Sequence, residues 1–186
     1  ARYGGDLAVG AMTIITSVSQ LVTLPLQGVC QGGQPIISYN YGAGHGDRVK
    51  KTFFLVFSVC MTYTVLFWAA VLLFPSVFAG IFTTNAELSG YTSWALRVYM
   101  AGIFACGAQC SCQQSFMALG QAKVSLLLAC LRKIVLLIPL ILILPHVLPF
   151  DPVFSVFLAE PVSDIAAAVI TTITFLARFN RILEMR

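Results

Sequence analysis

The sequence predicts an all-α, multi-pass membrane protein with five transmembrane helices in a single domain covering residues 1–186. Hydrophobic residues make up 59% of the chain and charged residues only 10%, whereas roughly a quarter of a soluble domain is charged. The apolar stretches are long and lack the alternating polarity of a membrane β-strand. Helix-breaking and turn residues separate these stretches. Together these observations indicate a helical bundle in a lipid bilayer.

Each predicted span is long enough for a hydrocarbon core of about 30 Å, which about 20 helical residues cross. The spans cover about residues 8–40, 49–74, 91–119, 123–145 and 152–177. Turn and capping residues lie between them, at 42–47, 83–85, 120–121 and 145–152. In the first of these turns, Asp47 is expected to cap the second helix.

Basic residues predict the orientation of the helices. They follow the first, third and fifth spans, as Arg48, Lys50, Lys51, Lys123, Arg178, Arg181 and Arg186. Loops 75–90 and 146–151 contain no Lys or Arg. The positive-inside rule then places the C-terminus in the cytoplasm and the N-terminus outside. Because the chain begins with Ala1 and lacks the pattern of a signal peptide, we expect a piece cut from a longer polytopic protein.

One face of the first span is polar along its whole length. Its members recur every three or four residues, which is helical spacing: Thr13, Thr16, Gln20, Thr23, Gln27, Gln31, Gln34 and Ser38. Amide side chains are costly against lipid, so this face must meet water or other polar groups. Two interpretations follow: the face lines a substrate pathway, or it joins helices through hydrogen bonds.

The same span contains Pro25 and Pro35, together with several glycines. Each proline removes a backbone hydrogen bond and clashes one turn earlier, so a bend is expected. The bend is either a static kink or a hinge that moves around cargo.

The third span repeats this polarity more weakly. Gln109 and Gln113 lie near one face with Cys106 and Gly102. The two glutamines either extend the polar lining of the first span or hydrogen-bond to neighbouring helices.

Acidic residues within the spans are confined to Glu160 and Asp164, one turn apart on the fifth helix. An intramembrane carboxylate is a functional candidate. Counting about 1.5 Å per residue, Asp164 and Arg132 of the fourth helix lie at similar depths. The alternatives are a buried ion pair of Asp164 with Arg132 or Lys133, and proton or cation coupling through Glu160 or Asp164.

Other functions find little support in the residues. The six cysteines form no zinc-type pair, so we expect no metal site. The Gly42–Gly46 run lacks the Lys-Ser/Thr ending of a P-loop. The net charge of +4 comes from loop clusters, so no nucleic-acid binding is expected. We expect neither an enzyme nor a resident cofactor.

Three motifs, in order, resemble the MATE (multidrug and toxic compound extrusion) family, especially its bacterial members. GVCQGGQPIISYNYGAGHGDR at 28–48 is similar to the family's helix-to-loop signature, and QSFMALGQAKVSLLLACLR at 114–132 to a later signature with an intramembrane Arg. Pro139 followed by EPVSD at 160–164 resembles the pattern near the last helix.

The resemblance implies that the chain corresponds to helices eight to twelve of a twelve-helix transporter, most of its six-helix C-terminal lobe. It implies an antiporter of the bacterial plasma membrane that exports bulky, often cationic compounds in exchange for sodium ions or protons by alternating access. Its partners would be the N-terminal lobe, drugs or toxins, and the lipid bilayer. The competing hypotheses are a flippase for lipid-linked saccharides and a non-transporting membrane scaffold. A flippase would need several basic residues in its cavity for phosphate.

Overall fold

The computed structural model describes residues 5–147 and 152–184, which are almost entirely helical. The helices are α1 (Gly5–Gly42), α2 (Gly46–Leu73), α3 (Pro75–Phe82), α4 (Ala86–Tyr99), α5 (Cys106–Ala118), α6 (Ala122–Cys130), α7 (Ile138–Val147) and α8 (Pro152–Glu184). A 3₁₀ segment, Met100–Ala105, joins α4 to α5. A π-helical segment, Leu131–Leu137, joins α6 to α7.

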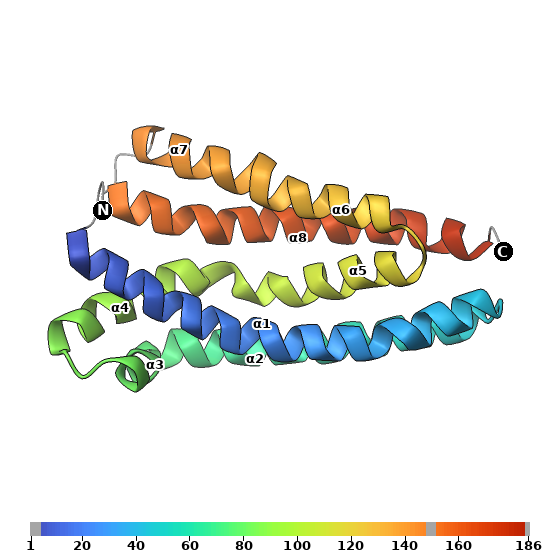
Figure 1. The fold of residues 1–186 in the computed structure, drawn as a ribbon, viewed down its shortest axis with the longest axis horizontal. Coiled ribbons are helices and arrows are strands. Elements are labelled where there is room, and N and C mark those ends of the chain that lie inside the picture. Colours follow the sequence, from blue (N-terminus) through green and yellow to red (C-terminus); the bar gives the residue numbers. More distant parts are fainter. Residues whose placement is uncertain (1–4, 148–151, 185–186) are drawn as a thin grey trace.

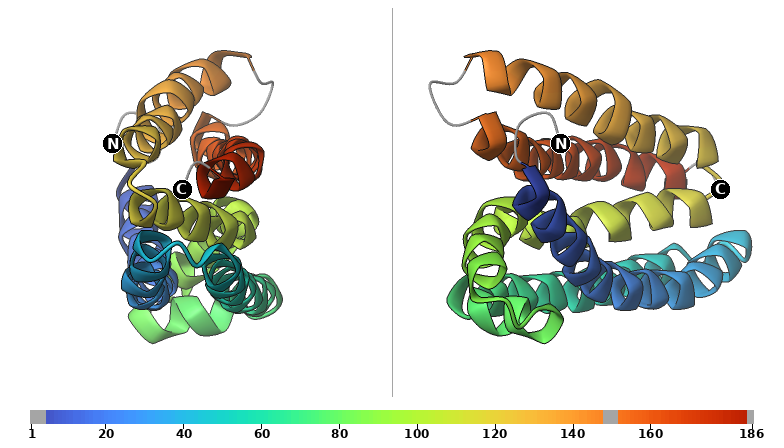
Figure 2. Two further views of the ribbon diagram at one scale, coloured as in Figure 1. Left: turned by 90° about the vertical axis from the view of Figure 1, so that its right-hand side faces the viewer. Right: turned by 60° about the vertical axis from the view of Figure 1, so that its left-hand side comes forward.

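The long segments lie side by side and run alternately in opposite directions (Figure 1). The α1–α2 turn, the α5–α6 turn and the end of α8 share one end of the molecule, while α3 and the start of α8 lie at the other. Figure 2 shows α1 and α2 on one side of the bundle, with α6 and α7 on the opposite side of α8. Helix α8 packs against α4, α5 and α7.

Within the described ranges, four continuous helical stretches are long and apolar enough to cross a membrane: Gly5–Gly42, Gly46–Leu73, Ala122–Val147 and Val153–Glu184. The region predicted as the third span, 91–119, is covered by α4, the 3₁₀ segment and α5, which follow one another without a gap. This span is therefore helical to Ala118, and the type of helix changes over Met100–Ala105.

A side chain of α2 contacts the 3₁₀ segment of the third span. Trp68 Nε1 donates to the Ala101 carbonyl at 3.1 Å, which gives this backbone oxygen a partner from another helix. The Thr64 hydroxyl lies 3.2 Å from the Phe104 carbonyl, but its single hydrogen has a nearer acceptor, the Cys60 carbonyl of its own helix at 2.9 Å. The third span contains no proline, so no proline marks the change of helix type in the sequence.

Two further details differ from expectation. The region 75–90, predicted as a loop, contains α3 and the first turn of α4. Asn85 caps α4, because its side-chain oxygen accepts from the backbone N–H groups of Glu87 at 2.9 Å and Leu88 at 3.3 Å. The prediction that Asp47 caps α2 was wrong: α2 starts at Gly46, so Asp47 already lies in its first turn.

Aromatic packing joins α2, α5 and α8 near the end that carries the α5–α6 turn. The Phe175 ring lies 4.5 Å from that of Phe53, 5.0 Å from that of Phe116 and 4.8 Å from that of Phe179, measured between centroids. In lipid, close packing of this kind replaces the hydrophobic effect as the force between helices.

Candidate functional site

The polar face of α1 turns away from the chain's own core. Its opposite side is buried through Ile15, Val18, Val22 and Leu26. Along the polar face, Gln20, Gln27 and Gln31 are exposed, and Thr23 and Gln34 are half-buried.

The hydroxyl and amide groups of this face behave differently. The threonine hydroxyls bond back to their own helix; Thr16, for example, donates to the Met12 carbonyl at 2.8 Å and Thr23 to the Ser19 carbonyl at 3.0 Å. Gln20, Gln27, Gln31 and Gln34 make no side-chain hydrogen bond to any other described part of the chain. Within this chain the four glutamines therefore do not join helices.

Pro25 leaves the Leu21 carbonyl without its usual backbone donor. The Tyr63 hydroxyl of α2 fills this position, donating to the Leu21 carbonyl at 2.9 Å. The carbonyl that Pro25 leaves free is thus satisfied by a side chain from outside α1. Proline at position 35 frees the Gln31 carbonyl in the same way, and within the described residues no side chain donates to it.

Beyond Pro25, α1 packs closely on α2. A Cβ atom added to Gly33 would lie 2.6 Å from Val56 Cγ2, so this glycine allows the two helices to approach. Nearby, Cys30 Sγ lies 3.6 Å from Cys60 Sγ. The second half of α1 therefore packs directly against α2.

A polar hollow of about 220 Å³ lies between α1, α5 and the π segment. Its lining is dominated by amide groups and includes one guanidinium: Thr23, Leu26, Gln27, Cys106, Gln109, Cys110, Gln113, Gln114 and Arg132. The structure thus brings Gln27, Gln109, Gln113 and Arg132 to one place. Gln20, Gln31 and Gln34 do not line this hollow.

The two predicted glutamines of the third span have different surroundings. Gln113 Nε2 donates to the Ser125 carbonyl of α6 at 3.4 Å, and the Ser125 hydroxyl donates to the Gln113 carbonyl at 3.2 Å. Gln113 therefore links α5 to α6. The Gln109 side chain is 3% exposed, and its Oε1 has no hydrogen-bond partner within the described residues.

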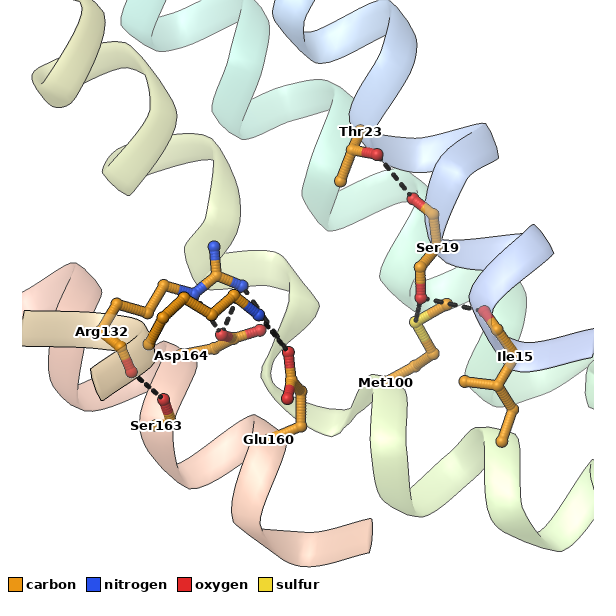
Figure 3. Close-up of polar contacts among 9 residues, drawn as sticks. Ile15, Ser19, Thr23, Met100, Arg132, Glu160, Ser163 and Asp164 are labelled. Atoms are coloured by element: carbon orange, nitrogen blue, oxygen red, sulfur yellow. Dashed lines mark hydrogen bonds and ion pairs between the residues drawn. The ribbon is translucent and has the colours of Figure 1, made fainter. Parts of the chain in front are cut away.

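Four charged side chains meet between α8 and the π segment. Figure 3 shows three of them, Arg132, Glu160 and Asp164. Arg132 Nη2 lies 2.6 Å from Asp164 Oδ1, and Arg132 Nε donates to the same oxygen at 2.8 Å. Lys133 Nζ lies 3.2 Å from Glu160 Oε1, which is 3.9 Å from Arg132 Nη2. The structure pairs Asp164 with Arg132, as their similar depths suggested, and the formal charges of the four groups cancel.

Helix irregularities surround this charge cluster. Gly102 of the 3₁₀ segment touches Pro161 of α8, because an added Cβ would lie 2.7 Å from the Pro161 Cα and carbonyl oxygen. The Ser163 hydroxyl donates to the Arg132 carbonyl in the π segment at 3.2 Å. Such irregular turns often occur at functional sites.

Sequence reasoning missed three side chains of α2 that lie against backbone carbonyls of other helices. Tyr63 lies at Leu21 of α1, and Thr64 and Trp68 lie at Phe104 and Ala101 of the 3₁₀ segment. Among the described residues, no group of three or more His, Cys, Asp or Glu side chains lies close enough together to hold a metal ion.

The family model for MatE matches residues 1–143. The chain belongs to the MATE family. Multidrug export protein MepA of Staphylococcus aureus strain NCTC 8325 is 27% identical over 177 residues, covering 91% of this chain and 37% of MepA. MATE is a family of transporters, so the chain belongs to transport proteins rather than enzymes.

Solved MATE structures share the fold. The MATE multidrug transporter DinF-BH is 31% identical with a TM-score of 0.82, covering all of this chain and 41% of that one. An outward-facing multidrug resistance MATE family transporter of the MOP superfamily gives a TM-score of 0.88 at 18% identity, covering 97% of this chain and 40% of that one. The chain thus spans about two fifths of the solved MATE proteins it matches.

Proposed function

We propose that this chain is the larger part of the C-terminal lobe of a multidrug exporter that moves bulky, often cationic compounds out of the cell. The observation that carries this proposal is the line of unpaired glutamines on α1, which leads into the polar hollow at Gln27. Such a face within a membrane helix needs an aqueous or ligand-filled neighbour. The multidrug export proteins among its relatives support the same conclusion.

The partner of this face would be an N-terminal lobe, so that a central cavity is closed by both halves. Transport would then follow alternating access driven by sodium ions or protons. Glu160 and Asp164 are the candidates for coupling in this lobe, because they are the carboxylates within the described part of α8 that lie inside its apolar stretch. No resident cofactor is part of this proposal.

The proposed orientation places the C-terminus in the cytoplasm of a bacterial cell, in its plasma membrane. Helix ends that carry Arg48, Lys123 and Arg181 lie at the same end of the bundle, which supports this assignment (Figure 1).

The charge pairing argues against the flippase alternative. Arg132 and Lys133, the cations nearest the hollow, are already paired with Asp164 and Glu160. A lipid-linked phosphate would have to compete with these carboxylates. A neutral, amide-lined wall suits a drug with few formal charges at the contact surface.

Transport by the complete protein in proteoliposomes tests the proposal. With sodium ions or protons concentrated in the lumen of inside-out vesicles, so that the ion gradient is directed outward, we expect accumulation of a planar cationic dye that stops when the gradient is dissipated. Replacing Gln27 with Leu should reduce the rate several-fold without changing the amount of folded protein. Absence of gradient-driven dye movement by the wild-type protein would contradict the proposed function.

A further inference from the structure

The Cys30 thiol of α1 has two thiol neighbours from other helices, next to the polar hollow. Its Sγ lies 3.6 Å from the Sγ of Cys60 of α2. It also interacts with the thiol of Cys110 of α5, a residue that lines the hollow. Among the described residues no three thiols meet closely enough to hold a metal ion, so the relevant chemistry is that of thiol pairs.

Glycines allow the backbones of α1, α2 and α5 to approach one another near these thiols. A Cβ atom added to Gly33 of α1 would lie 2.6 Å from Val56 Cγ2 of α2, and one added to Gly107 of α5 would lie 2.8 Å from the Cys60 carbonyl oxygen. Each glycine lies three residues from the thiol of its own helix. A disulfide needs Cα atoms about 4.4–6.8 Å apart, so close helix packing of this kind favours its formation.

The three thiols differ in their access to a small polar reagent. Cys30 is 2% exposed and Cys60 is 1% exposed, whereas Cys110 is half-buried and lines the hollow. Oxidation of a cysteine requires access as well as a thiolate. An oxidant that enters the hollow therefore meets Cys110 first.

We propose that Cys110, Cys30 and Cys60 form a thiol relay, an oxidation site at which hydrogen peroxide joins α1 to α2 by a disulfide. Peroxide oxidises the Cys110 thiol to a sulfenic acid and releases one water molecule. The Cys30 sulfur attacks the Cys110 sulfur and displaces its hydroxyl group, which takes up the thiol proton and leaves as a second water molecule.

Thiol–disulfide exchange completes the relay. The Cys60 thiolate attacks Cys30 Sγ, the bond between Cys30 and Cys110 breaks, and Cys110 departs as a thiolate that takes up the proton lost by Cys60. In total two thiols lose two electrons and two protons, and one peroxide becomes two water molecules. The final disulfide links the closest and most deeply buried pair.

The Cys30–Cys60 disulfide fastens the half of α1 that follows Pro25 to α2. In the proposed exporter, where α1 lines the pathway, this bond prevents the two helices from moving apart and slows transport. This effect on transport rests on the proposed function, whereas formation of the disulfide does not.

Peptide mapping of the complete protein tests the relay. The protein in proteoliposomes is treated with hydrogen peroxide, free thiols are alkylated, and disulfide-linked peptides are identified by mass spectrometry without reduction. We expect the Cys30–Cys60 pair to accumulate in the wild-type protein. Cys60→Ala should stop the relay at a disulfide between Cys30 and Cys110, and Cys110→Ala should slow formation of the Cys30–Cys60 disulfide several-fold.

Cys106→Ala is the matched control, because Cys106 lines the same hollow from the same helix as Cys110 and should leave this rate unchanged. Recovery of Cys30 and Cys60 as free thiols after peroxide has oxidised Cys110 would overturn the relay. An equal rate of disulfide formation in the Cys110→Ala variant would also overturn it, because peroxide would then reach the buried pair directly.

Export measured before and after oxidation tests the effect on transport. Peroxide should slow dye export by the wild-type protein several-fold, and dithiothreitol should restore it, while the Cys30→Ala variant should keep its rate. Unchanged export by protein in which the Cys30–Cys60 disulfide has fully formed would contradict this effect. If the wild-type protein exports no dye, the proposed function fails, whereas the mapped disulfide still decides whether the relay exists.

Discussion

The Arg132–Asp164 pair shows how one residue choice constrains a membrane bundle. The Asp164 side chain is 6% exposed and that of Arg132 is 23% exposed, so both ions are largely removed from water. A buried ion pair contributes little net stability by itself, but loss of one partner leaves the other as a buried unpaired charge. Glu160 differs because its partner Lys133 is 57% exposed, and solvent weakens that pair.

Substituting Asp164 with Asn is expected to destabilise the complete protein by about 3 kcal/mol, since Arg132 loses its counter-ion. Thermal unfolding in detergent measures this, with Glu160→Gln as the matched control that should cost less. If the pair is structural, the double variant Arg132→Met with Asp164→Leu should recover stability.

If Asp164 couples ions, Asp164→Asn should fold at normal abundance yet lose ion-driven efflux. If the Asp164→Asn variant is as abundant as the wild-type protein and exports at the same rate, both the structural role and the coupling role of Asp164 are refuted.

The kink of α1 depends on two helices. Pro25 was predicted from the sequence to bend α1, because proline lacks the N–H that the previous turn requires. The donor that replaces it, Tyr63, lies 42 residues after Leu21 in the chain and could not be predicted. The same holds for Trp68, which donates to the 3₁₀ segment of the third span. A proline in the sequence shows where a helix loses a backbone hydrogen bond. The side chain that replaces the lost donor comes from another helix and is known only from the tertiary structure.

A double-mutant cycle tests the link between Tyr63 and Pro25. Tyr63→Phe should destabilise the protein by about 1 kcal/mol, the typical contribution of one hydrogen bond. In a Pro25→Ala background the backbone N–H of the introduced alanine satisfies the Leu21 carbonyl, so Tyr63→Phe should then cost much less. Equal effects of Tyr63→Phe in both backgrounds, measured by thermal unfolding, would mean that the hydroxyl does not support the kink.

At the scale of the whole molecule, the glutamine face of α1 is a polar surface that no described helix of this chain covers. The polar periodicity of the first span predicted this surface, and the structure leaves Gln20, Gln27 and Gln31 exposed. The hollow itself was not predictable, because it requires α1, α5 and the π segment to meet. Sequence periodicity identifies a face of one helix, while the depth of a site depends on how helices pack.

The central claim is that the glutamine face of α1 lines an aqueous pathway. Cysteine at position 27, in a background without native cysteines, the six of this chain included, is labelled with a water-soluble thiol reagent in the complete protein. Ile36, which is 51% exposed and lies nine residues and about 180° by helical geometry from Gln27, provides an exposed apolar control. We predict labelling at 27 that depends on conformation and is blocked by a transported dye, with little labelling at 36. Absence of labelling at 27 in both inward- and outward-facing states would contradict the account.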